Sequence, residues 1–150
     1  MKMTIVDRPK AVQFIGLRHE GPHSESGPVF HRLAELLTEM DLWGSTGMWA
    51  GLRAHRPSGT SLSFAACAYP DTKPLPAGFE RVVLPAGRYA RLVHKGPLGG
   101  LPEAWSWCES VGLPALGASW TRGLAAELFL DDPDETPPED CRTEILIPID

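Results

Sequence analysis

The chain has 150 residues, which is the length of one domain built around one core. Hydrophobic residues make up 43 % of it, and this excludes disorder as a description of the whole chain. With 14 basic and 19 acidic residues the formal charge is −5, which argues against a surface that binds nucleic-acid phosphates.

The first predicted elements are a strand and a helix. An extended run over residues 12–17 leads into a His-Glu-Gly-Pro turn at 19–22, where glycine permits a sharp bend and proline supplies no backbone donor. Ser26 can cap a helix, and Pro28 suits the first helical turn. Apolar residues then recur at steps of three and four, which predicts a helix over residues 29–40.

Two more strands are predicted to complete the first half of the chain. They cover residues 48–54 and 62–68 and are separated by a turn-rich segment at 56–59. The stretch 69–78 contains three prolines, which favours a linker between two halves.

The second half predicts the same order of elements. An extended run leads into a His-Lys-Gly-Pro turn at 94–97, and an acidic, proline-rich loop occupies 131–140. Gly44 and Gly112 lie where the two helices are expected to stop. The predicted elements of this half are a strand at 89–93, a helix at 101–111 and strands at 122–130 and 143–149.

The two halves therefore indicate an internal repeat. The motif around His19 returns half a chain length later around His94, and a shared structural hydrogen bond is the interpretation that we favour for both histidines. We predict an α+β fold in which two pseudo-symmetric strand-helix-strand-strand repeats share an antiparallel sheet, with a central ligand cleft between them. The expected domain spans residues 1–150, with repeat one at about 1–71 and repeat two at about 79–150.

Three motifs in the second half resemble a known family. Residues 84–97 read LPAGRYARLVHKGP, residues 126–133 read AELFLDDP, and residues 143–149 read TEILIPI. They resemble the DNA gyrase inhibitor-like (GyrI-like) family, which includes the effector-binding domains of some AraC-type and MerR-type regulators. The resemblance covers nearly the whole chain in order and is strongest over 84–149.

The resemblance carries expectations about fold and ligand. It implies a pseudo-twofold α+β fold with a ligand cleft between the repeats, and it places Glu127 at the family's central ligand-facing acidic position. Members of the family bind lipophilic or aromatic molecules, often cations, and some have been linked to hydrolysis of electrophilic small molecules. Phe129 stands where a tyrosine is frequent in the family, so a phenolic hydroxyl is missing there.

Alternation along the strand 122–130 separates its residues into two faces. One set, Leu124, Ala126, Leu128 and Leu130, is expected to pack under the helices, which leaves Glu127 and its neighbours on the opposite face toward the cleft. A carboxylate among apolar neighbours is costly unless it is paired, and such a group attracts a cationic ligand. The alternative is an exposed glutamate on a solvated sheet face.

The tryptophans have two interpretations each. Trp49 and Trp120 either line the cleft or fill the core. Trp105 fits the apolar stripe of the second helix and Trp43 follows the first helix, so both are expected to serve packing. The expected ligand-binding set is Glu127, Phe129, Trp120 and Trp49.

The leading functional hypothesis is a standalone binding module that captures an amphipathic or aromatic, cationic small molecule beside Glu127. The alternatives are a hydrolase that uses Glu127 as general base or nucleophile, and a protein-interaction role toward gyrase or a regulator. No HExxH, CxxC or phosphate-loop spacing is present, so we expect neither a metal nor a cofactor. We also expect no direct nucleic-acid contact and no membrane contact. A cytoplasmic location is expected because the N-terminus lacks an apolar signal core.

Overall fold

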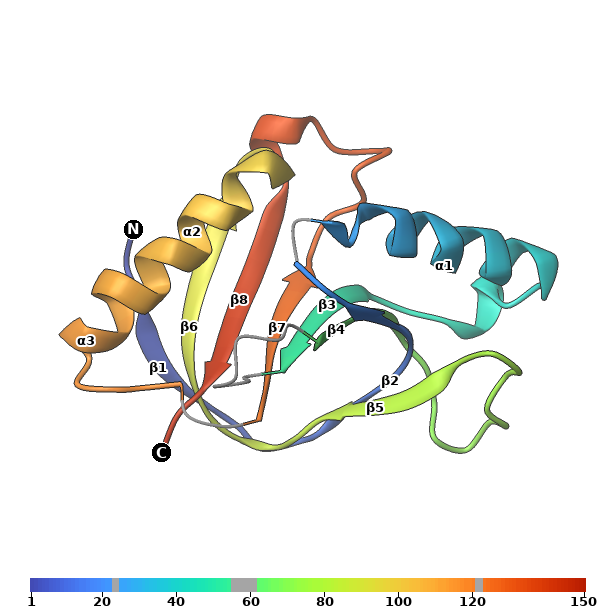
Figure 1. Cartoon of the computed structure of the whole chain (residues 1–150), viewed down its shortest axis with the longest axis horizontal. Coiled ribbons are helices and arrows are strands. Elements are labelled where there is room, and N and C mark those ends of the chain that lie inside the picture. The colour runs from blue at the N-terminus through green and yellow to red at the C-terminus, as the bar shows by residue number, and fades with distance from the viewer. Residues whose placement is uncertain (23–24, 55–61, 121–122) are drawn as a thin grey trace.

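The computed structural model describes residues 1–22, 25–54, 62–120 and 123–150 (Figure 1). Among these residues, eight strands form one antiparallel sheet in the order β1-β6-β8-β7-β3-β4-β2-β5. The α+β prediction is therefore confirmed. The strands are β1 (Thr4–Arg8), β2 (Val12–Glu20), β3 (Trp49–Ala54), β4 (Leu62–Ala68), β5 (Glu80–Leu84), β6 (Gly87–Lys95), β7 (Leu124–Phe129) and β8 (Arg142–Pro148).

Each half of the chain begins with a strand that the sequence does not predict. These strands, β1 and β5, have five residues each and form the two outer edges of the sheet. Each pairs with the other half: Val6 on β1 lies opposite Tyr89 on β6, and Val82 on β5 lies opposite Phe14 on β2. The halves thus exchange their first strands, and β7 meets β3 at the centre of the sheet.

Charged side chains join both exchanged strands, β1 and β5, to the rest of the sheet. Glu144 on β8 is 7 % exposed and accepts hydrogen bonds from Arg8 on β1 at 3.3 Å and from Arg91 on β6 at 2.6 Å. At the other edge, Arg18 on β2 donates two hydrogen bonds to Glu80 on β5, at 3.0 and 3.1 Å. The first cluster is partly buried, with a buried carboxylate at its centre, and the second is exposed. We therefore expect the two to differ in their contribution to stability.

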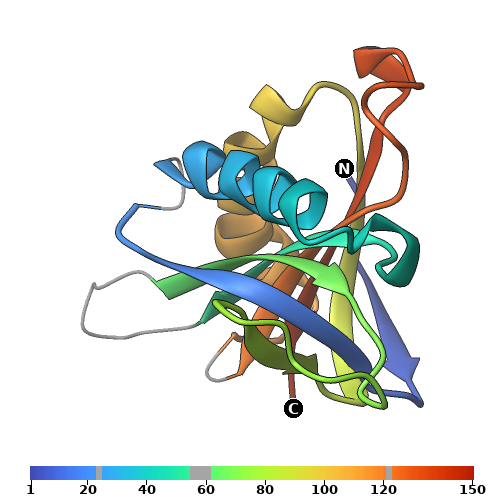
Figure 2. The ribbon, with the colours of Figure 1, turned by 90° about the vertical axis from the view of Figure 1, so that its right-hand side faces the viewer.

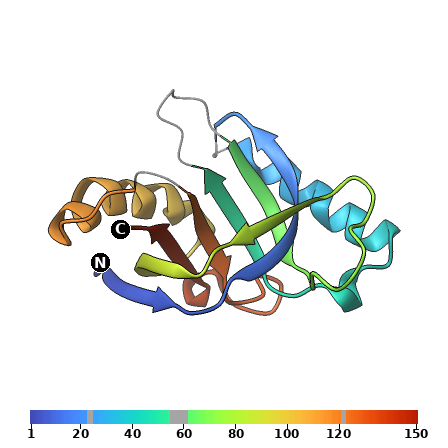
Figure 3. The ribbon, with the colours of Figure 1, turned by 90° about the horizontal axis from the view of Figure 1, so that it is seen from below.

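The helices cover one face of the sheet, with one helix over each half (Figures 1 and 2). In the view from the strand side they lie at opposite ends of the sheet (Figure 3). The helices are α1 (Gly27–Glu39), α2 (Leu101–Trp107) and α3 (Leu113–Ala115), with a π-helical turn at Cys108–Gly112 joining the last two. Short 3-10 turns occupy Trp43–Ser45, Leu98–Gly100 and Pro138–Asp140. No helix of the described residues is long and apolar enough to cross a membrane.

Both helical segments end in a Schellman motif rather than at the predicted glycines. After α1 the amide of Leu42 donates to the carbonyl of Leu37, and Asp41 adopts a φ of 54°. After α3 the amide of Ala118 donates to the carbonyl of Leu113, and Gly117 adopts a φ of 65°. The predicted stop at Gly112 is wrong because the π-helical turn carries the segment through it.

The two His-x-Gly-Pro turns have the same geometry. Nε2 of His19 lies 3.1 Å from the carbonyl of Pro22, and Nε2 of His94 lies 3.2 Å from the carbonyl of Pro97. A carbonyl oxygen only accepts, so Nε2 carries the proton in both rings. The glycine within each turn has a φ well above zero, 128° and 139°. The expected structural hydrogen bond is confirmed.

Both faces of the sheet are buried, and this reverses the predicted orientation of β7. Leu128 packs on the face opposite the helices, together with Phe14, Leu52 and Leu146. Ala125 packs under α2 instead, in one cluster with Trp105. The prediction that Leu124, Ala126, Leu128 and Leu130 lie under the helices is therefore wrong. Alternation separates two sets of residues, but it does not identify the helix side when both sets are apolar.

Candidate functional site

Glu127 lies at the centre of the sheet, where the two halves meet. It is 3 % exposed and stands on the helix-covered face of β7, opposite Gly51 on β3 and Ile145 on β8. The solvated-face alternative from the sequence is therefore excluded. A buried carboxylate needs compensating partners, so the groups around it decide what the site can do.

Helix α2 supplies one of these partners. The indole Nε1–H of Trp105 donates a hydrogen bond to Oε1 of Glu127 at 2.5 Å, and Trp105 is itself only 4 % exposed. The sequence predicts packing for Trp105, and its ring does belong to the core under α2. The polar role of its N–H was missed, although a buried indole generally needs an acceptor.

The residue opposite Glu127 leaves room for the carboxylate. A Cβ at Gly51 would lie 3.1 Å from Oε2 of Glu127 and 3.6 Å from Cζ of Phe30. Because glycine has no side chain, the carboxylate and the ring of Phe30 both approach the β3 backbone. The sheet centre thus brings together an acid from the second half and an aromatic ring from helix α1.

Aromatic rings extend from this centre toward α1. Phe30 is half-buried on α1 and stacks on Trp49 of β3, with ring centroids 6.2 Å apart. It also meets Phe129 of β7 edge-on at 5.8 Å. Trp43, which is 48 % exposed, also stacks on Trp49, with ring centroids 5.7 Å apart. Phe129 and Trp49, both expected at the site, are therefore linked through Phe30, which the sequence suggests only as part of the helix stripe.

A second aromatic contact lies on the α2 side. Trp120 is half-buried, and its ring centroid lies 6.1 Å from that of Trp105 with the planes tilted by 35°. Its Nε1 donates to the carbonyl of Gly123 at 3.3 Å. All four expected residues thus belong to one cluster around Glu127, in which Phe30 and Trp105 are the connecting rings.

The cluster also contains a cation that the sequence does not indicate. Arg53 lies two residues beyond Gly51 on β3, hence on the same face, and its Cζ is 4.3 Å from the ring centroid of Trp105. Burial lowers the pKa of Arg53, while the negative charges of Glu127 and Glu109 act in the opposite direction. The side chain remains charged near neutral pH, so a guanidinium and a carboxylate share one indole.

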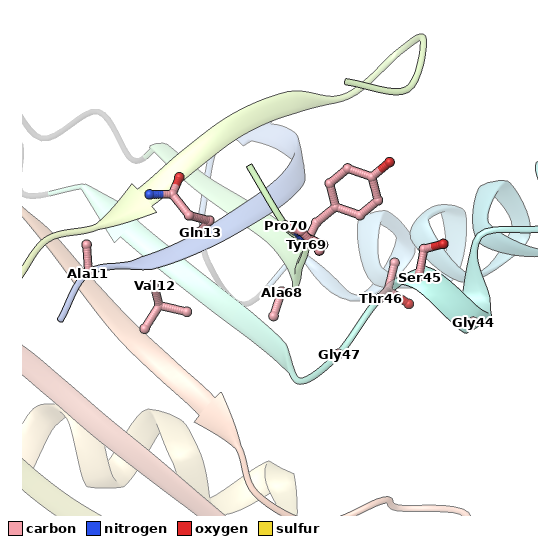
Figure 4. Close-up of a pocket in the computed structure, with 10 residues that line it drawn as sticks. All are labelled: Ala11, Val12, Gln13, Gly44, Ser45, Thr46, Gly47, Ala68, Tyr69 and Pro70. Carbon is pink, nitrogen blue, oxygen red and sulfur yellow. The ribbon is translucent and has the colours of Figure 1, made fainter. Parts of the chain in front are cut away.

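Two surface cavities lie away from this cluster. The first has a volume of about 470 Å³ and is shown in Figure 4, where Val12 and Ala68 extend to one side of their strands and Gln13 and Tyr69 to the other. The second, of about 430 Å³, lies at the corresponding place in the second half, beside the β5–β6 turn and the end of β8. Neither is lined by Glu127. We assign the site from the buried charges and rings, since the lining of the first cavity contains no carboxylate or basic side chain.

Two other kinds of site, metal centres and reactive thiols, depend on histidine, cysteine and carboxylate side chains. Within the described ranges, no group of three or more His, Cys, Asp or Glu residues could hold a metal ion. Burial raises the pKa of Cys67 to about 12 and that of Cys108 to about 11, so both thiols stay protonated at neutral pH. The chemistry that the cluster offers is electrostatic and aromatic.

Comparisons with known proteins agree with this architecture. Residues 1–150 match the family described as GyrI-like small molecule binding domain. No curated protein matches the chain. The structure is similar to SAV2435 bound to tetraphenylphosphonium, at 14 % identity and a TM-score of 0.72, with 100 % of this chain and 94 % of that chain covered.

Two further solved structures share the fold. The EcmrR C-terminal domain is 16 % identical with a TM-score of 0.74, covering 99 % of this chain and 97 % of that one. A hydrolase from Listeria innocua is 13 % identical with a TM-score of 0.63, covering 99 % of this chain and 92 % of that one. At these identities the likeness concerns the fold.

Proposed function

Because the chain belongs to the family of GyrI-like small molecule binding domains, we propose that it captures lipophilic aromatic cations at the cluster around Glu127. The observation that carries the proposal is the buried carboxylate, held by the N–H of Trp105 and surrounded by aromatic rings. A carboxylate at this depth attracts positive charge strongly, because little water screens it.

The rings provide the second half of the recognition. A cation placed over the face of an indole or phenyl ring gains about 0.5–2 kcal/mol per contact, and the gain is largest where water is excluded. Trp49, Phe129 and Trp120 are half-buried, and in this proposal they separate Glu127 from solvent. A ligand enters when these rings move aside, and it then contacts both their faces and the carboxylate.

Similarity to a ligand-bound protein supports the choice of ligand class. SAV2435 shares the fold and was solved with tetraphenylphosphonium, an aromatic cation with no hydrogen-bond donor. Such a ligand depends on charge and aromatic contact alone, which are the two features of this cluster. Tetraphenylphosphonium is therefore the probe of choice.

We also propose that the chain is one domain made of two repeats, at about 1–71 and 79–150. The exchange of β1 and β5 between the halves and the matching turns at His19 and His94 support this organisation. The site then lies on the axis that relates the repeats, since β3 and β7 are equivalent strands.

The direct test is a titration of tryptophan fluorescence with tetraphenylphosphonium, for the natural protein and for Glu127→Gln. We expect saturable quenching in the natural protein and at least tenfold weaker binding in the variant, which keeps the shape but loses the charge. Glu103→Gln removes an exposed acid of α2 and serves as the charge-matched control. Equal affinity of all three proteins would remove Glu127 from the proposal.

Hydrolysis remains the alternative activity, and the name of the similar Listeria innocua protein motivates its test. Incubation with strained electrophiles, followed by product analysis, separates turnover from capture. Product formation that disappears in Glu127→Gln would replace the binding proposal with a catalytic one. The absence of product above background would exclude hydrolysis of that substrate class.

A further inference from the structure

The side chain of Arg53 lies over the ring of Trp105, on the same face of the sheet as Glu127. One edge of the Trp105 indole donates to Glu127, and the face of the same ring carries the Arg53 guanidinium at 4.3 Å. Arg53 lies opposite Ala125 in the β3–β7 pair, two residues along β3 from the Gly51–Glu127 pair. An internal cation therefore covers the aromatic face of Trp105, close enough to Glu127 for the negative charge of that residue to act on it.

We propose that Arg53 is a tethered competitor that a ligand cation must displace from Trp105, and that this competition sets the charge specificity of the site. The inference rests on the proposed function of the same cluster. A guanidinium stacks well on an aromatic face because it is planar and weakly hydrated, so it resembles the ligand class in its interactions.

The balance of forces on Arg53 makes its release feasible. Burial lowers the pKa of Arg53, which disfavours its charge, while the carboxylates of Glu127 and Glu109 and the contact with the Trp105 ring offset part of this cost. When the side chain swings into water it regains hydration. The cost of displacement is then the loss of one cation–π contact and of its attraction to Glu127, both of which the entering cation restores.

This competition predicts which molecules the site accepts. A monocation that covers more aromatic surface than a guanidinium can take over both the ring face and the carboxylate. An anion of the same shape cannot replace Arg53, and it binds only while the guanidinium stays to offset Glu127. Because only the fraction of molecules with Arg53 released is competent for cations, the observed affinity is lower than the intrinsic one.

Two probes of equal shape and opposite charge test the inference: tetraphenylphosphonium and tetraphenylborate. Arg53→Met keeps a long apolar side chain but removes the competing charge. We expect about tenfold tighter binding of tetraphenylphosphonium and weaker binding of tetraphenylborate in this variant. Arg53→Lys, whose compact ammonium stacks less well, should show a smaller gain of about threefold for the phosphonium.

The matched control is Arg32→Met. Arg32 lies on the exposed side of α1, where it pairs with Glu35 and Glu39, so its removal changes the net charge equally without reaching the cluster. Its affinities for both probes should equal those of the natural protein. This control separates displacement of Arg53 from a general effect of charge on lipophilic ions.

Nuclear magnetic resonance of the arginine side chains gives a readout that does not depend on any variant's affinity. The Arg53 signal is the one missing from the spectra of both Arg53→Met and Arg53→Lys. In the natural protein it should carry a ring-current shift from Trp105. That shift should vanish at saturating tetraphenylphosphonium.

The two proposals fail in different ways. Equal phosphonium affinity in the natural protein and Arg53→Met, or an Arg53 signal that keeps its ring-current shift in the complex, would overturn the competitor role and leave the binding site intact. Absence of saturable binding in every protein would overturn the binding site and the competitor role together.

Discussion

Gly51 and Glu127 face each other across the central strand pair, one from each half of the chain. A Cβ at Gly51 would lie 3.1 Å from Oε2 of Glu127, closer than side chains normally approach. The position of the carboxylate at the seam thus depends on a residue with no side chain. This dependence makes Gly51 a sensitive probe of the site.

Gly51→Ala should weaken tetraphenylphosphonium binding about tenfold while leaving the free energy of unfolding within about 1 kcal/mol of its original value. Alanine is favoured over glycine in a strand by roughly 0.5–1 kcal/mol, and this gain opposes the crowding of Glu127. Fluorescence titration and urea unfolding measure the two effects separately. Gly99→Ala is the control, because a Cβ there meets nothing within 4 Å. Unchanged binding in Gly51→Ala would show that the carboxylate does not need this space.

Trp105→Phe should destabilise the fold and weaken cation binding. The phenyl ring retains most of the packing and the contact with Arg53, but Oε1 of Glu127 loses its N–H donor. A hydrogen bond to a charged group contributes about 1.5–3 kcal/mol, so a loss of that order is expected in urea unfolding. Trp107→Phe, on the same helix, should cost less. Equal losses at the two positions would mean that packing alone accounts for the effect.

Glu144→Gln should lower the free energy of unfolding by about 1–3 kcal/mol. The substitution leaves Arg8 and Arg91 beside a neutral group, and breaking a buried pair from one side costs about 3–5 kcal/mol. We discount that figure because the two arginine side chains are 30 % and 37 % exposed. Glu80→Gln breaks the exposed pair with Arg18 at the other edge and should cost less than Glu144→Gln, because solvent screens exposed charges. The reverse order, measured by chemical denaturation, would contradict this assignment.

The buried thiols predict an alkaline loss of stability. The pKa of Cys67 is raised from 9.0 to about 12, so the folded state binds a proton that the unfolded state releases. The stabilisation is complete below pH 9 and is lost as the pH rises toward 12. Urea midpoints measured between pH 8 and 11 should fall, and Cys67→Ala should show a shallower decline. At pH 8 the native thiol should resist disulfide reagents and react once urea unfolds the chain.

Long, patterned segments of this fold are predictable from the sequence, whereas short ones are not. The helix at 29–40 and the strand at 62–68 have clear apolar periods, and both lie within two residues of their predicted bounds at each end. The edge strands β1 and β5 have five residues of mixed polarity, and they are strands because the other half offers them an edge. No local pattern carries that information.

The residues of the candidate site also divide into those that the sequence predicts and those that it does not. Glu127 is the one acid of the apolar strand β7, as Glu144 is of β8, and the family resemblance is what gives Glu127 a role. The contacts of Arg53 and Phe30 depend on the register between β3 and β7 and on the placement of α1, which are tertiary properties. The orientation of β7 could not be predicted, since alternation is equally strong on its two buried faces.

The exchange of first strands has a consequence for how the protein is made. Thr4 pairs with Arg91, so the partner strand of β1 is synthesised only after more than half of the chain. Until then β1 remains unpaired. Such long-range pairing slows folding, and a waiting strand can join the open β6 edge of another nascent copy. Expression at a high level should therefore yield some domain-swapped dimers, in which each subunit supplies β1 to the sheet of the other. Such dimers separate only on unfolding.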